Sequence, residues 1–557
     1  MRTCVLFSIA VLLFGTSTNA QDVAIQVDLT RKIEPMRPVW AWFGYDEPNY
    51  TYMKDGKKLL TEISQLSNVP VYVRVHNLLS SGDGTAALKW GSTNAYTEDE
   101  NGNPVYDWTI VDKIFDTYVE RGMKPLVQIG FMPEALSVKP QPYRHYWTPR
   151  SRYNEIFTGW SHPPKDYDKW RELVYQWAKH SVARYGEKEV LTWYWEVWNE
   201  PDIGYWRGTF EEYCKLYDYA ADGLKRALPS AKIGGPHTTD PNGERAYKFL
   251  RDFLEHCVRG TNYATGKTGA PLDYVGFHAK GSPRIVDGRV QMDVGRQLRN
   301  ISNGFKAVAS FPELKHLPII IGESDPEGCA ACSVASHPQN AYRNGTMYSS
   351  YTAASFARKY ELARLHDVNF LGAVSWSFEF EDQPWFAGFR DLATNGVNKP
   401  VLNVFRMFGM MKGDLVAVTS SAPLSAEQIT ASSVRGDADI NALASMEPGN
   451  AAVMIWNYHD DDLPAKAANI SLKVDGIDAK RVLVFHYRID EKHSNSYEVW
   501  KRMGSPQNPT EEQYAELERS GQLQMLTSPR WADVADGVLK LNFDLPRQGV
   551  SLVKITW

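Results

Sequence analysis

The sequence lacks long apolar runs and any large excess of charge of one sign. After residue 20, no stretch approaches the roughly 20 consecutive apolar residues of a membrane-spanning helix. Lysine and arginine total 61 against 66 aspartates and glutamates, so the net charge is only -5. This balance argues against a surface for nucleic acid or anionic lipid as the main function. We therefore expect neither a nucleic-acid partner nor membrane insertion.

Cysteine is also scarce, with five in 557 residues. Cys329 and Cys332 form a C-x-x-C pair, but no second pair stands at a spacing that would complete a zinc site. A redox C-x-x-C begins a helix in a small βαβ domain, which this context does not match. A local disulfide is the favoured interpretation, with two free thiols as the alternative. No metal site is expected.

The first 20 residues have the composition of a secretory signal peptide. Arg2 precedes an apolar run from Cys4 to Gly15, and small residues precede Ala20. The run is too short to span a membrane. We therefore expect residues 1–20 to be removed and the protein to be secreted or periplasmic.

Aromatic residues, in contrast, are abundant. They make up 12% of the chain, with 18 Trp and 29 Tyr. Trp and Tyr combine a flat apolar ring with a polar group, which suits stacking on sugar rings.

The part from residue 21 to 409 alternates apolar segments with helical patterns, which predicts an α/β fold of the (β/α)8 TIM-barrel type. Near-continuous apolar runs are typical of parallel strands that are buried on both faces. An open doubly wound sheet usually has a glycine-rich phosphate turn after its first strand, and FGYDEPNY is not one. The eight strand candidates are residues 39–45, 69–79, 123–131, 191–200, 232–238, 274–281, 318–325 and 370–380.

Residues 410–557 change in character. Short β-rich segments separated by turn residues predict an antiparallel β-sandwich accessory domain. One helical insertion begins with a pattern like a capping box, Thr510-x-x-Gln513. The residues between the signal peptide and Val39 are a candidate for one more strand of this domain.

Two glutamates stand at strand ends. Glu200 ends the fourth strand candidate and Glu323 ends the seventh. In a closed barrel these ends share one mouth, and two facing carboxylates are what glycoside hydrolysis requires. Most of the 66 acidic residues must lie on solvated helix faces, so a solvated role is the alternative for either residue.

Several motifs together give a family resemblance. They are WNEPDIGYW around Glu200, GMKPLVQIGFMPEAL (122–136), GGPHTT (234–239) and HYRIDEKHSNSYEVWKRMGSP (486–506). The sequence from about Trp40 to the C-terminus resembles glycoside hydrolase family 39, which includes β-xylosidases and α-L-iduronidases. Asn-Glu-Pro marks only the wider clan, whereas the GFMPEAL and HSN-containing stretches are more specific.

The resemblance implies Glu200 as general acid/base and Glu323 as nucleophile. It further implies a substrate-binding group around them, with Asn199 on the sugar 2-hydroxyl or a nearby oxygen, Arg74 bracing the carboxylates and Trp376 as an apolar floor. Structural alternatives are a buried ion pair for Arg74 and plain packing for Trp376. His76 and His278 match two family histidines, and their alternative is a hydrogen-bonded core imidazole.

The sequence departs from the family in three places. Gly322 stands where many relatives have Thr before the nucleophile, with little chemical consequence expected. Ala279 and Lys280 follow His278 where relatives often have a Tyr that bonds the nucleophile. Lys280 is a candidate contact for an acidic or differently oriented substrate group, with a solvated lysine as the alternative. The ESDPEGCAACS loop is unlike that of the characterised xylosidases, which leaves another substrate open as an alternative.

We therefore predict a secreted, retaining, exo-acting glycoside hydrolase that is β-xylosidase-like and cleaves pentosyl units from plant-type glycans. Its partner is an oligosaccharide or glycoside. No cofactor is needed, because side chains supply both the proton donor and the nucleophile. Alternatives are the same chemistry on α-L-arabinosyl, arabinobiosyl, β-galactosyl, β-glucosyl or uronide units. A catalytically idle carbohydrate-binding protein is the rival from another class.

Overall fold

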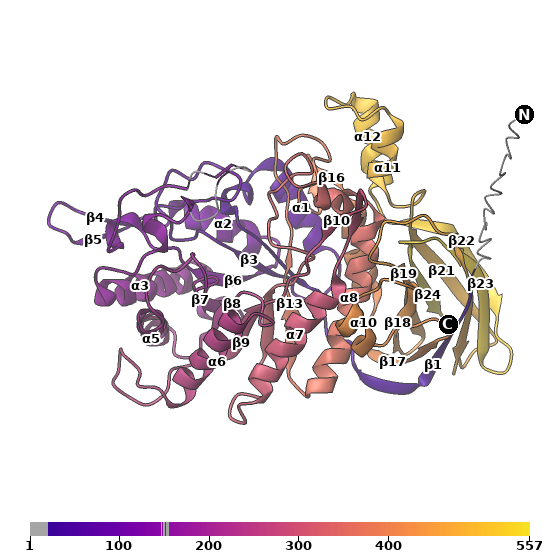
Figure 1. Ribbon diagram of the computed structural model, residues 1–557, viewed down its shortest axis with the longest axis horizontal. Helices are drawn as coiled ribbons and strands as arrows, with labels where there is room; N and C mark the ends of the chain where they lie inside the picture. Colours follow the sequence, from indigo (N-terminus) through magenta and orange to yellow (C-terminus); the bar gives the residue numbers. More distant parts are fainter. Residues whose placement is uncertain (1–20, 146, 149–150, 152–154) are drawn as a thin grey trace, which may run out of the picture.

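The computed structural model describes residues 21–145, 147–148, 151 and 155–557. The predicted signal peptide, residues 1–20, lies outside the described residues. The chain forms a barrel of parallel strands surrounded by helices, with a second large sheet beside it (Figure 1). Among the described residues, no helix combines the length and apolarity needed to cross a bilayer.

The barrel is a closed ring of parallel strands. Each strand pairs with the next along the chain, and β14 returns to pair with β2. β13 and β14 are two parts of one strand, interrupted at Val374, so the fold is TIM-barrel-like and all eight strand candidates are confirmed. The strands are β2 (Trp42–Tyr45), β3 (Tyr72–Val75), β6 (Lys124–Ile129), β7 (Tyr194–Val197), β8 (Lys232–Thr238), β9 (Tyr274–His278), β12 (Ile319–Glu323), β13 (Phe370–Ala373) and β14 (Ser375–Trp376).

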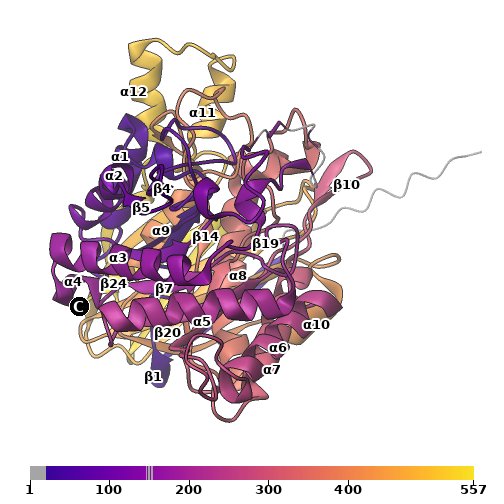
Figure 2. The same ribbon diagram turned by 90° about the vertical axis from the view of Figure 1, so that its left-hand side faces the viewer.

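Helices follow these strands and cover the outside of the barrel. α3 and α5 lie side by side across the face that Figure 2 turns toward the reader. The barrel helices are α1 (Lys54–Ser64), α2 (Thr109–Val119), α3 (Tyr167–Tyr185), α4 (Glu187–Val190), α5 (Phe210–Ala227), α6 (Glu244–Arg259), α7 (Val294–Ala309), α8 (Thr346–His366) and α9 (Pro400–Met410). Short hairpins decorate the connections: β4 (Tyr96–Glu98) with β5 (Pro104–Tyr106), β10 (Arg284–Val286) with β11 (Arg289–Gln291), and β15 (Ala393–Thr394) with β16 (Val397–Asn398).

Local sequence explains where these elements begin and what they bury. All residues of β9 and β12 are buried, as expected for strands with the barrel core on one face and helices on the other. α5 starts at a capping box in which Thr209 and Glu212 satisfy each other's backbone N–H groups. Asp166 caps α3 by accepting hydrogen bonds from two backbone N–H groups.

The second sheet contains nine strands in the order β22-β21-β24-β19-β18-β17-β1-β20-β23. The described pairing places all of them in one ordered sheet, so the two-layer sandwich stays a prediction. The pairing is also mixed, because β1 runs parallel to β20. The strands are β1 (Asp22–Pro35), β17 (Asp414–Ser420), β18 (Asp439–Glu447), β19 (Asn450–Tyr458), β20 (Ala468–Asp475), β21 (Arg481–Ile489), β22 (Gln524–Asp533), β23 (Val538–Leu545) and β24 (Val550–Thr556).

The first strand does not belong to the barrel. β1 lies between β17 and β20 and pairs with both. Its apolar side chains alternate with exposed ones, and Val23, Ile25, Val27 and Leu29 enter the core of the second sheet. The assignment of residues 21–409 to the barrel therefore needs a correction at its start, and the candidate extra strand near the N-terminus is confirmed.

The barrel and the second sheet share a packed interface. Alternate residues of β19 face opposite ways: Val453 and Ile455 enter the core of the second sheet, whereas Met454, Trp456 and Tyr458 join the large cluster that includes the barrel. α8 lies against this side of β19. α10 (Ala426–Ser432) fills the connection between β17 and β18 and contacts α7.

The helical insertion projects beside the barrel mouth. α11 (Ser496–Arg502) and α12 (Glu511–Ser520) form a pair at the top of Figure 1. The predicted capping box of Thr510 and Gln513 is present at the start of α12. Trp500 and Leu517 from this pair pack with Trp385 and Phe386 from the connection after β14.

Candidate active site

A cavity of about 430 Å³ opens at the carboxyl ends of the barrel strands, a size typical of small-molecule sites. Of the eight residues singled out from the sequence, five line it: Asn199, Glu200, Lys280, Glu323 and Trp376. The other three, Arg74, His76 and His278, are buried and contact the carboxylates from behind. The structure therefore brings all eight together.

Glu200 occupies a sharp turn after β7. Trp198 and Glu200 both have positive φ, 71° and 44°, which non-glycine residues rarely adopt. The turn is fixed by backbone hydrogen bonds: Trp198 N donates to Ile129 O at 3.1 Å and Glu200 N donates to His237 O at 3.0 Å. Pro201 follows directly and prevents the strand from continuing.

Glu323 is the last residue of β12 and is surrounded by cations. Lys280 Nζ lies 2.5 Å from Glu323 Oε2, and Arg74 Nη1 lies 3.1 Å from Glu323 Oε1. Burial alone would raise the pKa of this carboxyl, but the positive charges of Lys280 and Arg74 outweigh it and hold the pKa below its usual value. Glu323 is therefore ionised at neutral pH.

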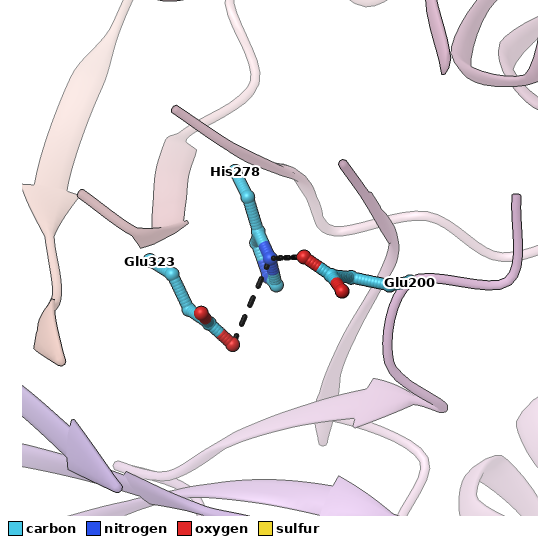
Figure 3. A group of neighbouring side chains, drawn as sticks. All are labelled: Glu200, His278 and Glu323. Atoms are coloured by element: carbon cyan, nitrogen blue, oxygen red, sulfur yellow. Dashed lines mark hydrogen bonds and ion pairs between the residues drawn. The ribbon is translucent and has the colours of Figure 1, made fainter. Parts of the chain in front are cut away.

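Glu200 faces Glu323, and its pKa is shifted in the opposite direction. One ligand atom each from Glu200, His278 and Glu323 lie within 4.8 Å of one another. In Figure 3 the imidazole of His278 lies between the two carboxylates, with Nδ1 at 2.9 Å from Glu200 Oε1 and 3.7 Å from Glu323 Oε1. Burial, followed by the negative charges of Glu323 and Asp202, raises the pKa of Glu200 well above its usual value. The surroundings thus favour the protonated form of Glu200 and the ionised form of Glu323.

Arg74 joins Glu323 to a buried network that contains Glu196 and Asn199. Its guanidinium is fully buried and donates from Nε to both oxygens of Glu196, at 2.8 and 2.9 Å. Nη2 donates to Asn199 Oδ1 at 2.8 Å. This contact orients the amide of Asn199 so that its NH₂ group remains for a ligand in the pocket. The alternative interpretation, that Arg74 belongs to a buried ion pair, also holds, because Arg74 pairs with Glu196.

A second charged group lies on the other side of the pocket. His76 Nδ1 is 2.9 Å from Asp46 Oδ1, and Lys89 Nζ is 3.1 Å from Asp46 Oδ2. Burial and the nearby Arg74 lower the pKa of His76, so this imidazole is neutral at neutral pH. Trp376 packs against His76 and lies over the Arg74 guanidinium, with 4.8 Å from Arg74 Cζ to the ring centroid. Trp376 lines the cavity as expected for a floor.

Lys280 is not the solvated lysine of the alternative interpretation. The residue is only 7% exposed, and its ammonium group contacts both Glu323 and Asp325. It takes the hydrogen-bonding place beside Glu323 that the resemblance assigns to a Tyr in relatives, and it adds a positive charge there.

The structure gives a steric reason for glycine at position 322, which the sequence did not reveal. A Cβ at this position would lie 2.1 Å from His237 Nδ1, and a Cβ at Gly276 would lie 2.2 Å from His237 Nε2. The two glycines, on adjacent strands, therefore make room for the imidazole of His237. Its Nε2 lies 2.9 Å from Glu196 Oε2, which completes the buried network around Arg74.

Sequence reasoning missed the residues that hold the site from neighbouring strands and from the connections that follow them. They are Asp46, Lys89, Glu196, His237, Asp240 and Asp325. Glu196 carried a usable signal, because a charged residue inside an apolar strand is unusual. Asp325 also stood close to Glu323 in ESDP. Nothing in the local sequence of Lys89 marked it.

The predicted disulfide between Cys329 and Cys332 is present and forms part of the pocket wall. Arg343 is buried beneath this loop and donates to the carbonyl oxygens of Cys329 and Cys332 at 2.6 and 2.9 Å. Glu327 forms ion pairs with Arg343 and Arg390. Arg390 also donates to Trp376 O at 2.8 Å, so the loop and the floor of the pocket are held by the same group.

By distance alone, Glu200, His278 and Glu323 would fit around a metal ion. The charges do not suit one, because Glu323 already has an ammonium and a guanidinium group as partners. A cation there would meet positive charge on two sides. The arrangement fits a proton donor facing an anionic nucleophile.

Comparisons with known proteins find similarity along most of the chain. The chain is 26% identical over 499 residues to the β-xylosidase of Geobacillus stearothermophilus, covering 87% of this chain and 86% of that protein. It is 24% identical over 568 residues to the α-L-iduronidase of Mus musculus, covering 95% of this chain and 80% of that protein.

Solved structures share the fold. A bacterial orthologue of human α-L-iduronidase matches with a TM-score of 0.76 at 21% identity, over 96% of this chain and 84% of that one. A β-xylosidase from Caulobacter crescentus CB15 matches with a TM-score of 0.73 at 20% identity, over 96% and 99%. The model of the family described as glycosyl hydrolases family 39 covers residues 23–532. The chain therefore belongs to glycosyl hydrolase family 39.

Proposed function

We propose that this glycoside hydrolase is an exo-acting, β-xylosidase-like enzyme that removes pentosyl units from plant-type glycans. Glu200 is its general acid/base and Glu323 its nucleophile. The observation that carries these roles is the pair of facing carboxyls with opposite pKa shifts in one sugar-sized cavity. Exo action is supported by a compact pocket lined by loops that follow strands on all sides of the barrel.

The reaction proceeds by two displacements, as in other members of this retaining family. Glu323 attacks the anomeric carbon, the glycosidic C–O bond breaks, and the proton of Glu200 moves to the leaving oxygen. Glu200, now ionised, takes a proton from a water molecule whose oxygen bonds to the anomeric carbon of the glycosyl-enzyme. The bond between that carbon and Glu323 breaks, and Glu323 is again a free carboxylate. The sugar leaves with its original anomeric configuration, and Glu200 is protonated again.

The neighbouring residues serve this cycle. Lys280 and Arg74 keep Glu323 ionised before attack. The amide of Asn199, oriented by Arg74, donates to a sugar hydroxyl close to the anomeric carbon. Such a contact accelerates the reaction if it strengthens as the oxocarbenium-like transition state forms.

The charges in the pocket favour a neutral sugar. Four carboxyl groups line it, from Asp46, Glu200, Asp240 and Glu323, against two ammonium groups, from Lys89 and Lys280. Both ammonium groups already contact a carboxylate, Asp46 and Glu323 respectively. A substrate carboxylate would therefore meet no unneutralised cation among these groups.

A uronide is the second candidate. It is supported by the position of Lys280 in the pocket wall and by the α-L-iduronidases among the relatives. Turnover of nitrophenyl β-D-xyloside with none of 4-methylumbelliferyl α-L-iduronide is the expected result. The reverse pattern would contradict the pentoside proposal and favour the uronide.

Replacing the nucleophile tests the mechanism. Glu323→Ala should abolish turnover of nitrophenyl β-D-xyloside, and added azide should restore turnover with formation of the inverted glycosyl azide. Glu313→Ala is the matched control, because Glu313 pairs on the surface with Arg259. Normal turnover by Glu323→Ala without azide would show that Glu323 is not the nucleophile.

Export is part of the proposal. Its support is the composition of residues 1–20 and the Cys329–Cys332 disulfide, because disulfides persist in oxidising compartments. Fractionation of the producing cells, with N-terminal sequencing of the mature protein, tests it. Retention in the cytoplasm with an intact N-terminus would contradict export.

A further inference from the structure

The turn that carries Glu200 is fastened to the neighbouring connection of the barrel by Asp202. Oδ1 of Asp202 accepts a hydrogen bond from the backbone N of Thr239 at 2.8 Å, and Oδ2 accepts one from the Thr239 hydroxyl. Thr239 is the first residue after β8, so these bonds join the turn after β7 to the turn after β8. The side chain of Asp202 is fully shielded from solvent.

The two turns also meet through their backbones. Glu200 N donates to His237 O, and both residues have positive φ, 44° and 50°. Such conformations are strained for residues other than glycine and persist only where surrounding contacts hold them. Asp202 follows Glu200 by two residues, so its two bonds to Thr239 hold the strained backbone from the far side of Pro201.

The charge of Asp202 is poorly balanced by its partners. Both of its hydrogen-bond donors are neutral groups of Thr239. Among the described residues, the cation paired with it is Arg245, with 3.7 Å between Nε and Oδ2, and the Arg245 side chain is 69% exposed, so that solvent screens it. A buried negative charge this close in the chain disfavours a second one on Glu200 and agrees with the raised pKa of that carboxyl.

Other charged and titratable groups face Glu200 from the surrounding strands. They are His278 on β9, which lies between the two carboxyls in Figure 3, Glu323 on β12, Asp240 after β8 and Lys280 after β9. All of these belong to connections or strands other than β7. Asp202 differs from them because it stands on the same turn as Glu200, where it affects both the position of the carboxyl and its charge state.

We propose that Asp202 is a positioning residue for the proton donor: its carboxylate holds the Glu200 turn against Thr239, so that the Glu200 carboxyl stays directed at the leaving oxygen. The inference rests on the proposed function, because it needs Glu200 as the general acid. Asp202 does not line the cavity and therefore acts through Glu200. Its charge also helps to keep the proton on Glu200 until the glycosidic bond breaks.

Two substitutions separate the charge of Asp202 from its contacts. Asp202→Asn removes the charge but keeps an oxygen for the backbone N of Thr239 and an amide group for its hydroxyl. Asp202→Ala removes the charge and both contacts. The substrates are phenyl β-D-xyloside, whose leaving group needs the proton of Glu200, and dinitrophenyl β-D-xyloside, whose leaving group departs without it.

Asp202→Asn should move the basic limb of the kcat/KM profile for the phenyl substrate, its fall at high pH, to lower pH by about one unit. The reason is that Glu200 loses its proton more readily without the neighbouring charge. Asp202→Ala should show this shift and also lower kcat/KM at the pH optimum roughly tenfold or more, since a displaced general acid protonates poorly. For the dinitrophenyl substrate, kcat/KM should stay close to the wild-type value in both variants.

Asp252→Asn is the matched control, because it removes a negative charge from α6, where Asp252 pairs with Lys248 away from the cavity. An unmoved basic limb in Asp202→Asn would overturn the inference, and so would a loss in Asp202→Ala that is equal for the two substrates. If Asp202→Ala does not fold, the pH profile of Asp202→Asn still decides. Unchanged kcat/KM for the phenyl substrate in Glu200→Gln would instead contradict the proposed function, because Glu200 would then not be the proton donor.

Discussion

At the scale of single residues, Lys280 has the closest contact among the cations around Glu323. Its ammonium group bonds both Glu323 and Asp325, and Asp325 in turn accepts a hydrogen bond from the backbone N of Trp376 at 2.9 Å. One lysine thus joins the proposed nucleophile to the strand that carries the floor of the pocket.

Lys280→Met should raise the pKa of Glu323, because a positive charge that lowers it is removed. Glu323 must be ionised to attack, so the acid limb of the kcat/KM profile should move to higher pH. We expect a shift of about one pH unit or more, which corresponds to about 1.4 kcal/mol per unit. A pH profile of nitrophenyl β-D-xyloside turnover measures it.

Lys280→Arg keeps the charge and should return the acid limb toward its wild-type position. A lysine with a purely structural role would change the amount of folded enzyme but leave the shape of the pH profile unaltered. An unmoved acid limb in Lys280→Met would therefore contradict the assignment.

The sequence indicated where a candidate site residue lies when its position along one strand carried the signal. Glu200 and Glu323 follow buried apolar runs, and a strand end is visible in one dimension. Most of the residues that determine the protonation of Glu200 and Glu323 come from other strands. Contacts between strands cannot be seen in the sequence of one strand. His237 contacts Glu196 only because Gly276 and Gly322 make room for it, and those three positions lie in separate motifs.

At the scale of elements, the disulfide loop forms one wall of the pocket. The loop supplies Gly328, Cys329, Cys332 and His337 to the pocket wall, and Arg343 holds its carbonyl groups from beneath. The rigidity of this wall depends on a covalent link between residues three apart in sequence.

Replacing both cysteines, Cys329→Ser with Cys332→Ser, should raise KM several-fold with a smaller change in kcat. KM should rise because the pocket wall formed by the disulfide loop becomes more mobile. The change in kcat should be smaller because Glu200 and Glu323 keep their own partners. A closed loop of four residues contributes about 2 kcal/mol of stability in the chain-entropy model, so the variant should still fold. Steady-state kinetics and thermal unfolding measure the two effects.

The control uses a cysteine outside the wall. Cys214→Ser changes a buried free thiol on α5 and should leave the response to reducing agent unchanged. Wild-type enzyme treated with dithiothreitol should reproduce the KM of the double variant. Equal KM values for oxidised and reduced enzyme would exclude a role of the disulfide in substrate binding.

The elements of the barrel were predictable because parallel strands buried on both faces give apolar runs. The run expected at residues 370–380 became β13 and β14, joined at Val374. The second sheet was less predictable. Its short segments indicate strands, but strand order depends on long-range pairing, such as that of Asp22 with Asn469.

At the scale of the whole molecule, the second sheet depends on its N-terminal strand. β1 lies in the interior of the sheet, and Ile25 is almost fully buried in its core. Removing β1 would leave two unpaired edges, on β17 and on β20.

Ile25→Ala should lower the stability of the second sheet by about 2–5 kcal/mol, the usual cost of such a truncation in a packed core. Urea unfolding followed by circular dichroism measures the change. Gln26→Ala is the control from the next position, because its side chain is exposed and bonds only Asp475 among the described residues. Equal urea midpoints for the two variants would show that β1 does not support the sheet.

The position of β1 has a consequence for biosynthesis. β1, the first strand of the described chain, pairs with β17 and β20, which are synthesised about 400 residues later. It therefore cannot form its native pairing until they have left the ribosome. The barrel, which lies between them in the sequence, can fold first. At that stage β1, with its apolar side chains, is still unpaired at the N-terminal end of the barrel. We therefore expect the nascent N-terminal segment to need protection by chaperones, and the last third of the chain to release it.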